Sequence, residues 1–405
     1  MVVKTRKHKS DLAILFSALG LMGLGLIVIY AIGPMRANVL NSAYGADYDP
    51  NYFFIHQLVS VGIALAAFFA AFKIPYETLK KVSKLVMILG LFLCGLMWVL
   101  SLAHSSMVKC ELGACRWFAV GGVSFQPAEF LKLGLVLYLA NLIGRKKEEG
   151  TIGSLKEFWL PVGVMSGLSL IFVVILQKDL GTGLALLAII VSMVLISGVS
   201  MKQFLIMIVA VAILGVGSVV LSAHRMERLK TFFGGGDADA SYHVENAMLA
   251  IGTGGMFGVG IGNSVQATGY LPESINDSVF AVMGETFGFV GLFVVVGVFA
   301  VMLFRTLKIA EYSGDLERRL VVTGVFAWLA THTIVNIMAM TGLMPVTGIT
   351  LPLLSYGGTS ILFVAFGLGL VWQFSCYTER EVNNEDTSSG RGVRRTYHSS
   401  RRRSS

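Results

Sequence analysis

Charged side chains inside otherwise apolar stretches are the residues of this sequence best suited to chemistry. Asp277 stands just before the long apolar run from Val279 to Phe304, whose only charge is Glu285. Burying one charge in a bilayer costs at least about 2.5 kcal/mol, so such residues are typical of functional sites. A carboxylate at this place could accept a proton, and Asp277 is therefore the first candidate for a general base.

A second pair of opposite charges lies in another apolar run. Glu129 and Lys132 are three residues apart, which places them on one face of a helix and within pairing distance. Pro127 suits the first turn of that helix. Two interpretations are open at this point: a structural ion pair that neutralises itself, or two members of a polar site.

Further charges flank the apolar runs. Arg116 could hold a phosphate through its planar guanidinium, but beside Trp117 it is equally typical of an interfacial anchor. Lys178 and Asp179 have the same ambiguity, since they could also mark a tight turn between two runs. Cys110 and Cys115 share the segment before Arg116, where a disulfide and two free thiols are equally consistent with the sequence.

Composition indicates the elements that must position these residues. The chain has 405 residues, 55% hydrophobic and 14% charged, with a mean hydropathy of +0.73. A soluble globule has about 25% charged residues, so we predict an all-α polytopic membrane protein. Apolar runs long enough to cross about 30 Å of hydrocarbon predict ten transmembrane helices. They lie near residues 12–32, 55–72, 85–103, 128–143, 158–176, 181–198, 204–222, 279–304, 320–341 and 360–376.

The distribution of charge predicts the orientation. Most of the 32 basic residues fall in alternate gaps and in the two termini, which places both termini in the cytoplasm by the positive-inside rule. The same distribution argues against nucleic-acid binding, despite the net charge of +8. We therefore divide the chain into a basic N-terminus (1–11), a ten-span membrane domain (12–376) with a large outer loop at 223–277, and a disordered basic tail (377–405).

Glycine-rich stretches add local constraints. The run from Gly258 to Gly262 resembles a dinucleotide-binding loop, but no βαβ unit surrounds it, and residues 242–262 instead suggest a re-entrant or interfacial segment. The segment 342–358 contains too many glycines and prolines for a regular helix, so it should line a cavity or lie under other elements. The histidines show no metal-ligand spacing, and we interpret His332 as a satisfied polar residue of the bundle.

These stretches together resemble the SEDS family (shape, elongation, division and sporulation) of the FtsW and RodA type, from about Asp11 to Gln373. The resemblance implies a peptidoglycan glycosyltransferase that polymerises lipid II at the outer face of the cytoplasmic membrane. Residues 225–229 and 258–260 are more similar to the division branch (FtsW) than to the elongation branch (RodA). The motifs are Arg116–Phe118 with Phe125–Leu133, Gln177–Thr182, Ala250–Gly260, Tyr270–Glu273 with Asp277, and Thr341–Gly348 with Leu354–Gly358.

The sequence departs from the family pattern around the expected catalytic position. The family usually has His-Thr-Asp where this chain has Ile275, Asn276 and Asp277, and Ser278 stands where phenylalanine is common. Lys178 also replaces a usual proline. Asp277 itself is retained, so the resemblance still implies a functional base with altered local packing.

The implied reaction joins the 4-hydroxyl of one lipid-linked disaccharide to the anomeric carbon of another, with inversion and loss of a polyprenyl pyrophosphate. Asp277 is the expected base, Arg116 and Lys132 are expected to contact the pyrophosphate, and Glu129 to orient Lys132. A divalent cation, Mg²⁺ or Mn²⁺, could share this work, although no ligand cluster indicates one. Further expected substrate contacts are Asp179, Glu285, Ser355 and Tyr356.

Family resemblance also implies partners and leaves alternatives open. A class B penicillin-binding protein, whose transpeptidase cross-links the product, and other division proteins are the expected partners at the division septum. The competing hypotheses are a lipid II flippase or transporter, an elongation-type polymerase, and a non-catalytic scaffold of the division machinery. Charges within the spans cluster toward the outer half, which disfavours a transport path through both leaflets.

Overall fold

A computed structural model of the chain describes residues 9–111, 114–120, 123–220, 226, 227, 230, 232 and 238–378. The basic segment 1–8, the residues Arg225 and Arg228 that begin the large loop, and the tail from residue 379 lie outside this range. Within the described residues, ten helices are long and apolar enough to cross a membrane, which confirms the predicted number of spans.

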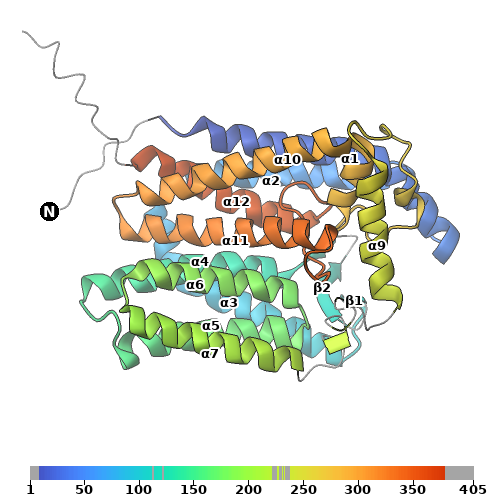
Figure 1. The fold of residues 1–405 in the computed structure, drawn as a ribbon. Helices are drawn as coiled ribbons and strands as arrows, with labels where there is room; N and C mark the ends of the chain where they lie inside the picture. Colours follow the sequence, from blue (N-terminus) through green and yellow to red (C-terminus); the bar gives the residue numbers. More distant parts are fainter. Residues whose placement is uncertain are drawn as a thin grey trace, which may run out of the picture.

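The spans run side by side as a single bundle (Figure 1). The fifth span, Leu155–Leu176, consists of the π-helices η1 (Leu155–Trp159) and η2 (Ile171–Leu176) on either side of α5 (Leu160–Leu170). The other nine are α1 (Leu12–Tyr44), α2 (Tyr52–Lys73), α3 (Tyr76–Leu102), α4 (Pro127–Glu148), α6 (Leu180–Ser197), α7 (Met201–Val220), α10 (Val279–Glu311), α11 (Leu316–Met340) and α12 (Gly358–Phe374).

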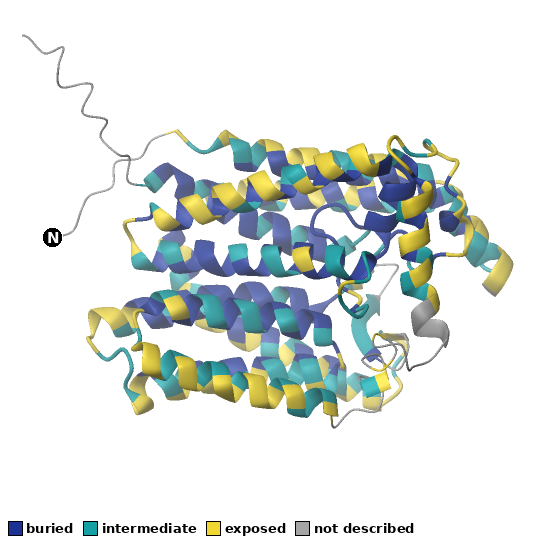
Figure 2. Cartoon of the chain, viewed as in Figure 1, coloured by how far each residue is buried: buried dark blue, intermediate teal, exposed yellow. Residues whose placement is uncertain are grey.

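Burial divides the spans into an inner and an outer set. Helices α4, α11 and α12 are mostly buried, and α6 packs against α11, so these four form the centre of the bundle (Figure 2). Helix α7 has no buried residue, and its apolar side chains face outward. Because every buried backbone group must be paired, a bundle of complete helices is the arrangement that such apolar runs adopt in a membrane.

Two helices are longer than the sequence predicts. Helix α1 continues to Tyr44 instead of ending near residue 32, and it includes Pro34 within the helix. Helix α10 extends to Glu311 and is interrupted at Gly288, whose φ of 67° and ψ of −169° are not helical. Hydropathy alone marks only the apolar part of a helix, so it cannot show how far the helix continues into polar sequence.

A small β-sheet is the main element that the all-α prediction omits. Three antiparallel strands in the order β1-β2-β3 connect α3 to α4: β1 (Val108–Glu111), β2 (Ala114–Val120) and β3 (Val123–Phe125). Cys110 pairs with Cys115 across β1 and β2, and the two form a disulfide. The sheet lies at one end of the bundle, beside the loops that carry the candidate site.

The large loop before α10 closes the same end. Helix α9 (Ala238–Thr253) lies across the ends of the spans, as an interfacial segment would (Figure 1). The glycine-rich stretch after it packs on the break in α10, where Phe289 N donates to Gly255 O at 2.8 Å and Val259 N donates to Glu285 O at 2.9 Å. The glycines of this motif therefore permit backbone to pack against backbone. The short 3₁₀ helix η3 (Gln266–Thr268) follows, and η4 (Ser375–Tyr377) ends the last span.

Candidate functional site

Asp277 lies in the turn that leads into α10, just outside the membrane-spanning segment. Only 6% of the residue is exposed. Burial, with a smaller contribution from the nearby carboxylate of Glu273, raises the pKa of Asp277 to about 7. Its carbonyl oxygen accepts a hydrogen bond of 2.7 Å from Asn336 on α11, which fixes the backbone at this point. The side chain is thus a buried carboxyl group that exchanges a proton near neutral pH.

Gly348, in the irregular segment between α11 and α12, brings Asp277 and Arg116 together. A Cβ built on Gly348 would lie 3.9 Å from Arg116 Nη1 and 4.0 Å from Asp277 Oδ2. The carboxylate and the guanidinium therefore face the same space above a residue that has no side chain. Gly348 has a φ of +74°, so its backbone conformation also favours glycine.

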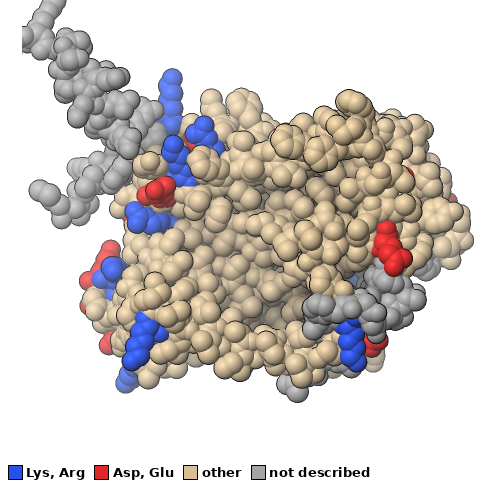
Figure 3. All heavy atoms as spheres, viewed as in Figure 1, with Lys and Arg blue, Asp and Glu red and all other residues tan. Residues whose placement is uncertain are grey.

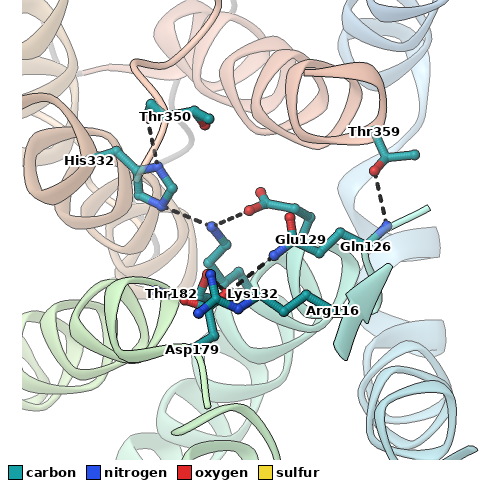
Figure 4. A network of polar contacts seen from close by, with 9 residues as sticks. All are labelled: Arg116, Gln126, Glu129, Lys132, Asp179, Thr182, His332, Thr350 and Thr359. Carbon is teal, nitrogen blue, oxygen red and sulfur yellow. Dashed lines mark hydrogen bonds and ion pairs between the residues drawn. The ribbon is translucent and has the colours of Figure 1, made fainter. Parts of the chain in front are cut away.

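Arg116 is held over this space by strand β2 and by the start of α6. Its Nη2 donates to the carbonyl oxygen of Lys178 at 3.0 Å, and its Nε lies 3.8 Å from Asp179 Oδ2. Asp179 is the N-cap of α6, where its carboxylate accepts hydrogen bonds from Thr182 N and Thr182 Oγ1. Gln126 donates to the same carboxylate at 3.3 Å (Figure 4). Asp179 therefore orients Arg116, and its direct contact with substrate stays a prediction.

Glu129 and Lys132 form the ion pair that their spacing predicts, with 2.8 Å between Lys132 Nζ and Glu129 Oε1. Lys132 has no exposed surface, and its Nζ also lies 2.9 Å from His332 Nε2 and 4.7 Å from the centre of the Trp328 ring. The pair therefore sits beneath the site, between α4 and α11 (Figure 4). Contact of Lys132 with a pyrophosphate stays a prediction, and this arrangement favours an indirect role.

Glu285 is occupied by contacts with its own protein. Its carboxylate accepts hydrogen bonds from Ser264 Oγ at 2.5 Å, Val265 N at 2.9 Å and Gln266 N at 3.2 Å. These contacts fasten the end of the large loop to α10. Contact of Glu285 with substrate stays a prediction. These hydrogen bonds favour an anchoring role for its carboxylate.

Ser355 and Tyr356 shape the backbone of the irregular segment. Leu351 N donates to Ser355 Oγ at 2.8 Å, and Tyr356 N donates to the carbonyl oxygen of Ile275 at 2.8 Å. The second contact joins this segment to the turn that contains Asp277. Both residues thus lie close to the candidate base, while their contact with substrate stays a prediction.

Several residues of the site have no role there in the sequence prediction. Asn336 contacts Asp277 directly. His332, which the sequence predicts only to be a polar residue of the bundle, contacts Lys132. The two residues stand four apart in an apolar span. That spacing indicates a shared polar face of the helix, and it is the feature of the sequence from which they could be predicted. Gln126 and Thr182 belong to motifs that the sequence identifies, but their contacts with Asp179 depend on the fold.

The described residues contain no group of three or more His, Cys, Asp or Glu side chains that could hold a metal ion. The arrangement that is present places a buried carboxyl group and a guanidinium next to the same glycine. Such a pair can remove a proton from a hydroxyl and stabilise a developing anion.

Comparisons with known proteins identify the family of this chain. The family model described as cell cycle protein, FTSW_RODA_SPOVE, matches residues 12–380. Stage V sporulation protein E of Bacillus subtilis is 32% identical over 92% of this chain and 99% of its own length. A probable peptidoglycan glycosyltransferase FtsW of Coxiella burnetii is 31% identical over 91% of this chain and 97% of that protein.

Solved structures show the same fold. One, described as structural coordination of polymerization and crosslinking by a peptidoglycan synthase complex, superposes with a TM-score of 0.69 at 26% identity, covering 90% of this chain and 97% of the other. The crystal structure of the Thermus thermophilus rod shape determining protein RodA gives a TM-score of 0.63 at 26% identity, covering 92% and 98%. Both cover nearly the whole bundle.

Proposed function

Because the chain belongs to the FtsW/RodA/SpoVE family of cell cycle proteins, also called the SEDS family, we propose that it is a peptidoglycan glycosyltransferase that polymerises lipid II. The placement of Asp277 and Arg116 next to Gly348 is the observation that carries this proposal. The names of curated relatives, probable peptidoglycan glycosyltransferase FtsW, support the same activity and favour septal synthesis during cell division.

In this mechanism Asp277 is the general base. It takes the proton from the 4-hydroxyl of the acceptor disaccharide while that oxygen attacks the anomeric carbon of the donor. The bond from that carbon to the pyrophosphate oxygen breaks, and Arg116 stabilises the departing anion. One carboxylate suffices for a single displacement with inversion. A pKa of about 7 allows Asp277 to accept the proton at neutral pH and then release it.

The site faces the outside of the cell in this proposal. Lys and Arg side chains gather at the end of the bundle opposite the β-sheet and α9 (Figure 3). Basic loops favour the cytoplasmic side, so the site and the sheet are assigned to the outer face of the cytoplasmic membrane. That face is where a lipid-linked disaccharide can be joined to the growing cell wall.

A class B penicillin-binding protein is the proposed partner. The peptidoglycan synthase complex that shares this fold is described as coordinating polymerization with crosslinking, which supports a paired transpeptidase. Other division proteins are expected to join the complex at the septum.

The test is polymerisation of labelled lipid II by the purified protein, with and without its penicillin-binding protein partner. We expect Asp277→Asn to make no polymer while staying folded and keeping its binding of lipid II. Asp315→Asn is the control, because Asp315 caps α11 through a hydrogen bond to Glu317 N at 3.2 Å and lies at the opposite end of the bundle. Full polymerisation by Asp277→Asn would exclude this residue as the base. Flipping of lipid II by a parent protein that makes no polymer would favour the flippase hypothesis instead.

A further inference from the structure

Helix α11 carries two buried polar side chains that have no role in the reaction proposed above. His332 is 3% exposed and Asn336 is 1% exposed. They are four residues apart, so they lie one above the other on the same face of the helix, in line with Trp328. Each contacts one part of the site, and both contact the irregular segment that lies between α11 and α12.

Asn336 ties the irregular segment to the turn that contains the base. Its Nδ2 donates to the carbonyl oxygen of Asp277 and to that of Ile349, each at 2.7 Å. One amide group therefore uses both of its hydrogens to hold two stretches of chain that are far apart in sequence. Since Ile349 follows Gly348, this contact also fixes the backbone that lies next to Asp277 and Arg116.

His332 ties the same segment to the buried ion pair. Lys132 Nζ can only donate while it is charged, so His332 Nε2 accepts the 2.9 Å hydrogen bond. The ring must then carry its hydrogen on Nδ1, which donates to the carbonyl oxygen of Thr350 at 3.4 Å. Thr350 is the residue after Ile349, so both contacts of α11 meet on adjacent peptide groups.

The segment is confined from its other side by α6. A Cβ on Gly181 would lie 3.1 Å from the carbonyl oxygen of Thr347 and would overlap the side chain of Ile349. Residues 347–350 are thus held between the start of α6 and the polar face of α11. A shift of this backbone would move Gly348 relative to both Asp277 and Arg116.

We propose that His332 and Asn336 are positioning residues that hold residues 348–350 and thereby set Asp277 and the Glu129–Lys132 pair in register for the reaction. This inference rests on the proposed glycosyltransferase function. Helix α11 thereby aligns Asp277 with the buried Glu129–Lys132 pair through one short stretch of backbone, residues 348–350. Neither residue is required to touch the substrate.

The first test is steady-state polymerisation of lipid II by the full-length protein with its penicillin-binding protein partner. We expect Asn336→Ser and His332→Leu each to lower kcat by about tenfold, the order of one lost buried hydrogen bond, with KM changed less than about threefold. His332→Gln, which keeps one donor and one acceptor, should restore kcat to within about threefold of the parent. Unchanged kcat in both of the first two variants would overturn the inference.

Thr331→Val is the control on the same helix. Its hydroxyl donates only within α11, to the carbonyl oxygen of Ala327 at 2.7 Å. This variant should retain the parent's kcat. If Thr331→Val lowers kcat as much as Asn336→Ser does, the effect belongs to helix stability and the positioning inference is wrong.

The double variant tests whether both residues act on one stretch of backbone. Once residues 348–350 are released by the first substitution, the second should add little, so the combined loss in kcat should be clearly smaller than the product of the single losses. Losses that multiply would show two independent effects and would contradict the shared stretch.

A readout independent of polymerisation separates this inference from the proposed function. Hydrophobic carbodiimides modify protonated carboxyl groups, and mass spectrometry can follow their reaction with Asp277 against pH. From the raised pKa of Asp277 we expect a midpoint near 7 in the parent. Asn336→Ser should shift this midpoint, whereas Thr331→Val should leave it unchanged. If the parent makes no polymer, the proposed function fails, and the positioning inference is then tested by the carbodiimide midpoints alone. Identical midpoints in the parent and in Asn336→Ser would refute the positioning inference.

Discussion

At the scale of single residues, the site depends on how one carboxyl group is buried. Asp277 is removed from water, while Glu273 stands nearby and is itself paired with Arg36 at 3.4 Å. Burial disfavours the charged form, and so the carboxyl group keeps its proton to a higher pH than an exposed aspartate. A base with a pKa near the working pH combines a useful ionised fraction with good proton affinity.

This pKa gives a specific pH dependence of activity. The base must be ionised, so kcat/KM should rise about tenfold per pH unit below 7 and level off above it, with a midpoint near 7. Initial rates between pH 5.5 and 8.5 in buffers of constant ionic strength would measure it. A midpoint near 4, the value for an exposed aspartate, would show that Asp277 is not the titrating base.

The raised pKa of Asp277 also affects stability: activity should rise with pH, whereas the contribution of Asp277 to folding should fall. Because the folded-state pKa is raised, the folded protein binds more protons than the unfolded chain between about pH 4 and pH 7. Asp277 therefore favours folding less as pH rises through this window. We expect Asp277→Asn to raise the unfolding temperature relative to the parent at pH 8, with little difference at pH 4. Equal differences at both pH values would contradict the raised pKa.

Gly348 offers a second residue-scale prediction. In Gly348→Ala the added methyl group would cover the position beside Arg116 and Asp277, so lipid II should bind less well and KM should rise by roughly tenfold. Gly262→Ala is the control, since its φ of +84° imposes similar backbone strain but its Cβ meets no atom within 4 Å. Both variants should lose about 1 kcal/mol of stability. Only Gly348→Ala should impair polymerisation of lipid II.

At the scale of elements, helix α10 is two helices in one span. The first begins next to Asp277 and ends at Gly288, where the glycine-rich loop after α9 docks on the open backbone. Glu285 fastens the other side of the loop through the hydrogen bonds around Ser264. The break thus connects the large loop before α10 to the helix whose first turn follows Asp277.

The break predicts a large difference between two glycines of the same helix. A Cβ on Gly288 would lie 2.6 Å from the carbonyl oxygen of Met256, whereas a Cβ on Gly297 would meet no atom within 4 Å. Gly288→Ala should therefore lose about 2 to 4 kcal/mol of stability, because backbone cannot move aside as a side chain can. Gly297→Ala should be neutral or gain up to about 1 kcal/mol from helix propensity. Thermal unfolding of both variants in detergent would measure this, and equal midpoints would argue against the docked loop.

The disulfide hairpin is the corresponding element on the other side of the site. Cys110 and Cys115 join β1 to β2 directly before Arg116, whose guanidinium reaches the start of α6. The hairpin thereby presents a cation to the site from strand β2, and its strands pack on α3 and α4. A chemical cross-link compensates for the small apolar area that such a sheet can bury.

At the scale of the whole molecule, the orientation of the bundle can be tested directly. Cys94 and Cys376 are buried and the other two cysteines are disulfide-bonded, so an introduced thiol should be the main reactive one. In intact cells, a membrane-impermeant maleimide should label Ser106→Cys, which is exposed at the end with the β-sheet. Lys156→Cys, exposed at the opposite end, should react only after permeabilisation. The reverse pattern would place the site in the cytoplasm and exclude cell-wall polymerisation by this site.

Sequence patterns predict the ten spans because each apolar run must cross the membrane as a helix. They also predict the Glu129–Lys132 pair, since residues three apart in a helix are neighbours. The sheet, the break at Gly288 and the contact between His332 and Lys132 depend on partners far away in the chain. No local periodicity encodes such contacts, and so the sequence identifies most members of the site without showing how they meet.

Gly348 limits how this protein could evolve around an inhibitor. Any single-nucleotide change in a glycine codon that substitutes another amino acid adds a side chain. At Gly348 every such side chain would enter the space beside Asp277 and Arg116. A compound that fills this space would therefore contact a position where resistance by substitution would also obstruct the natural substrate.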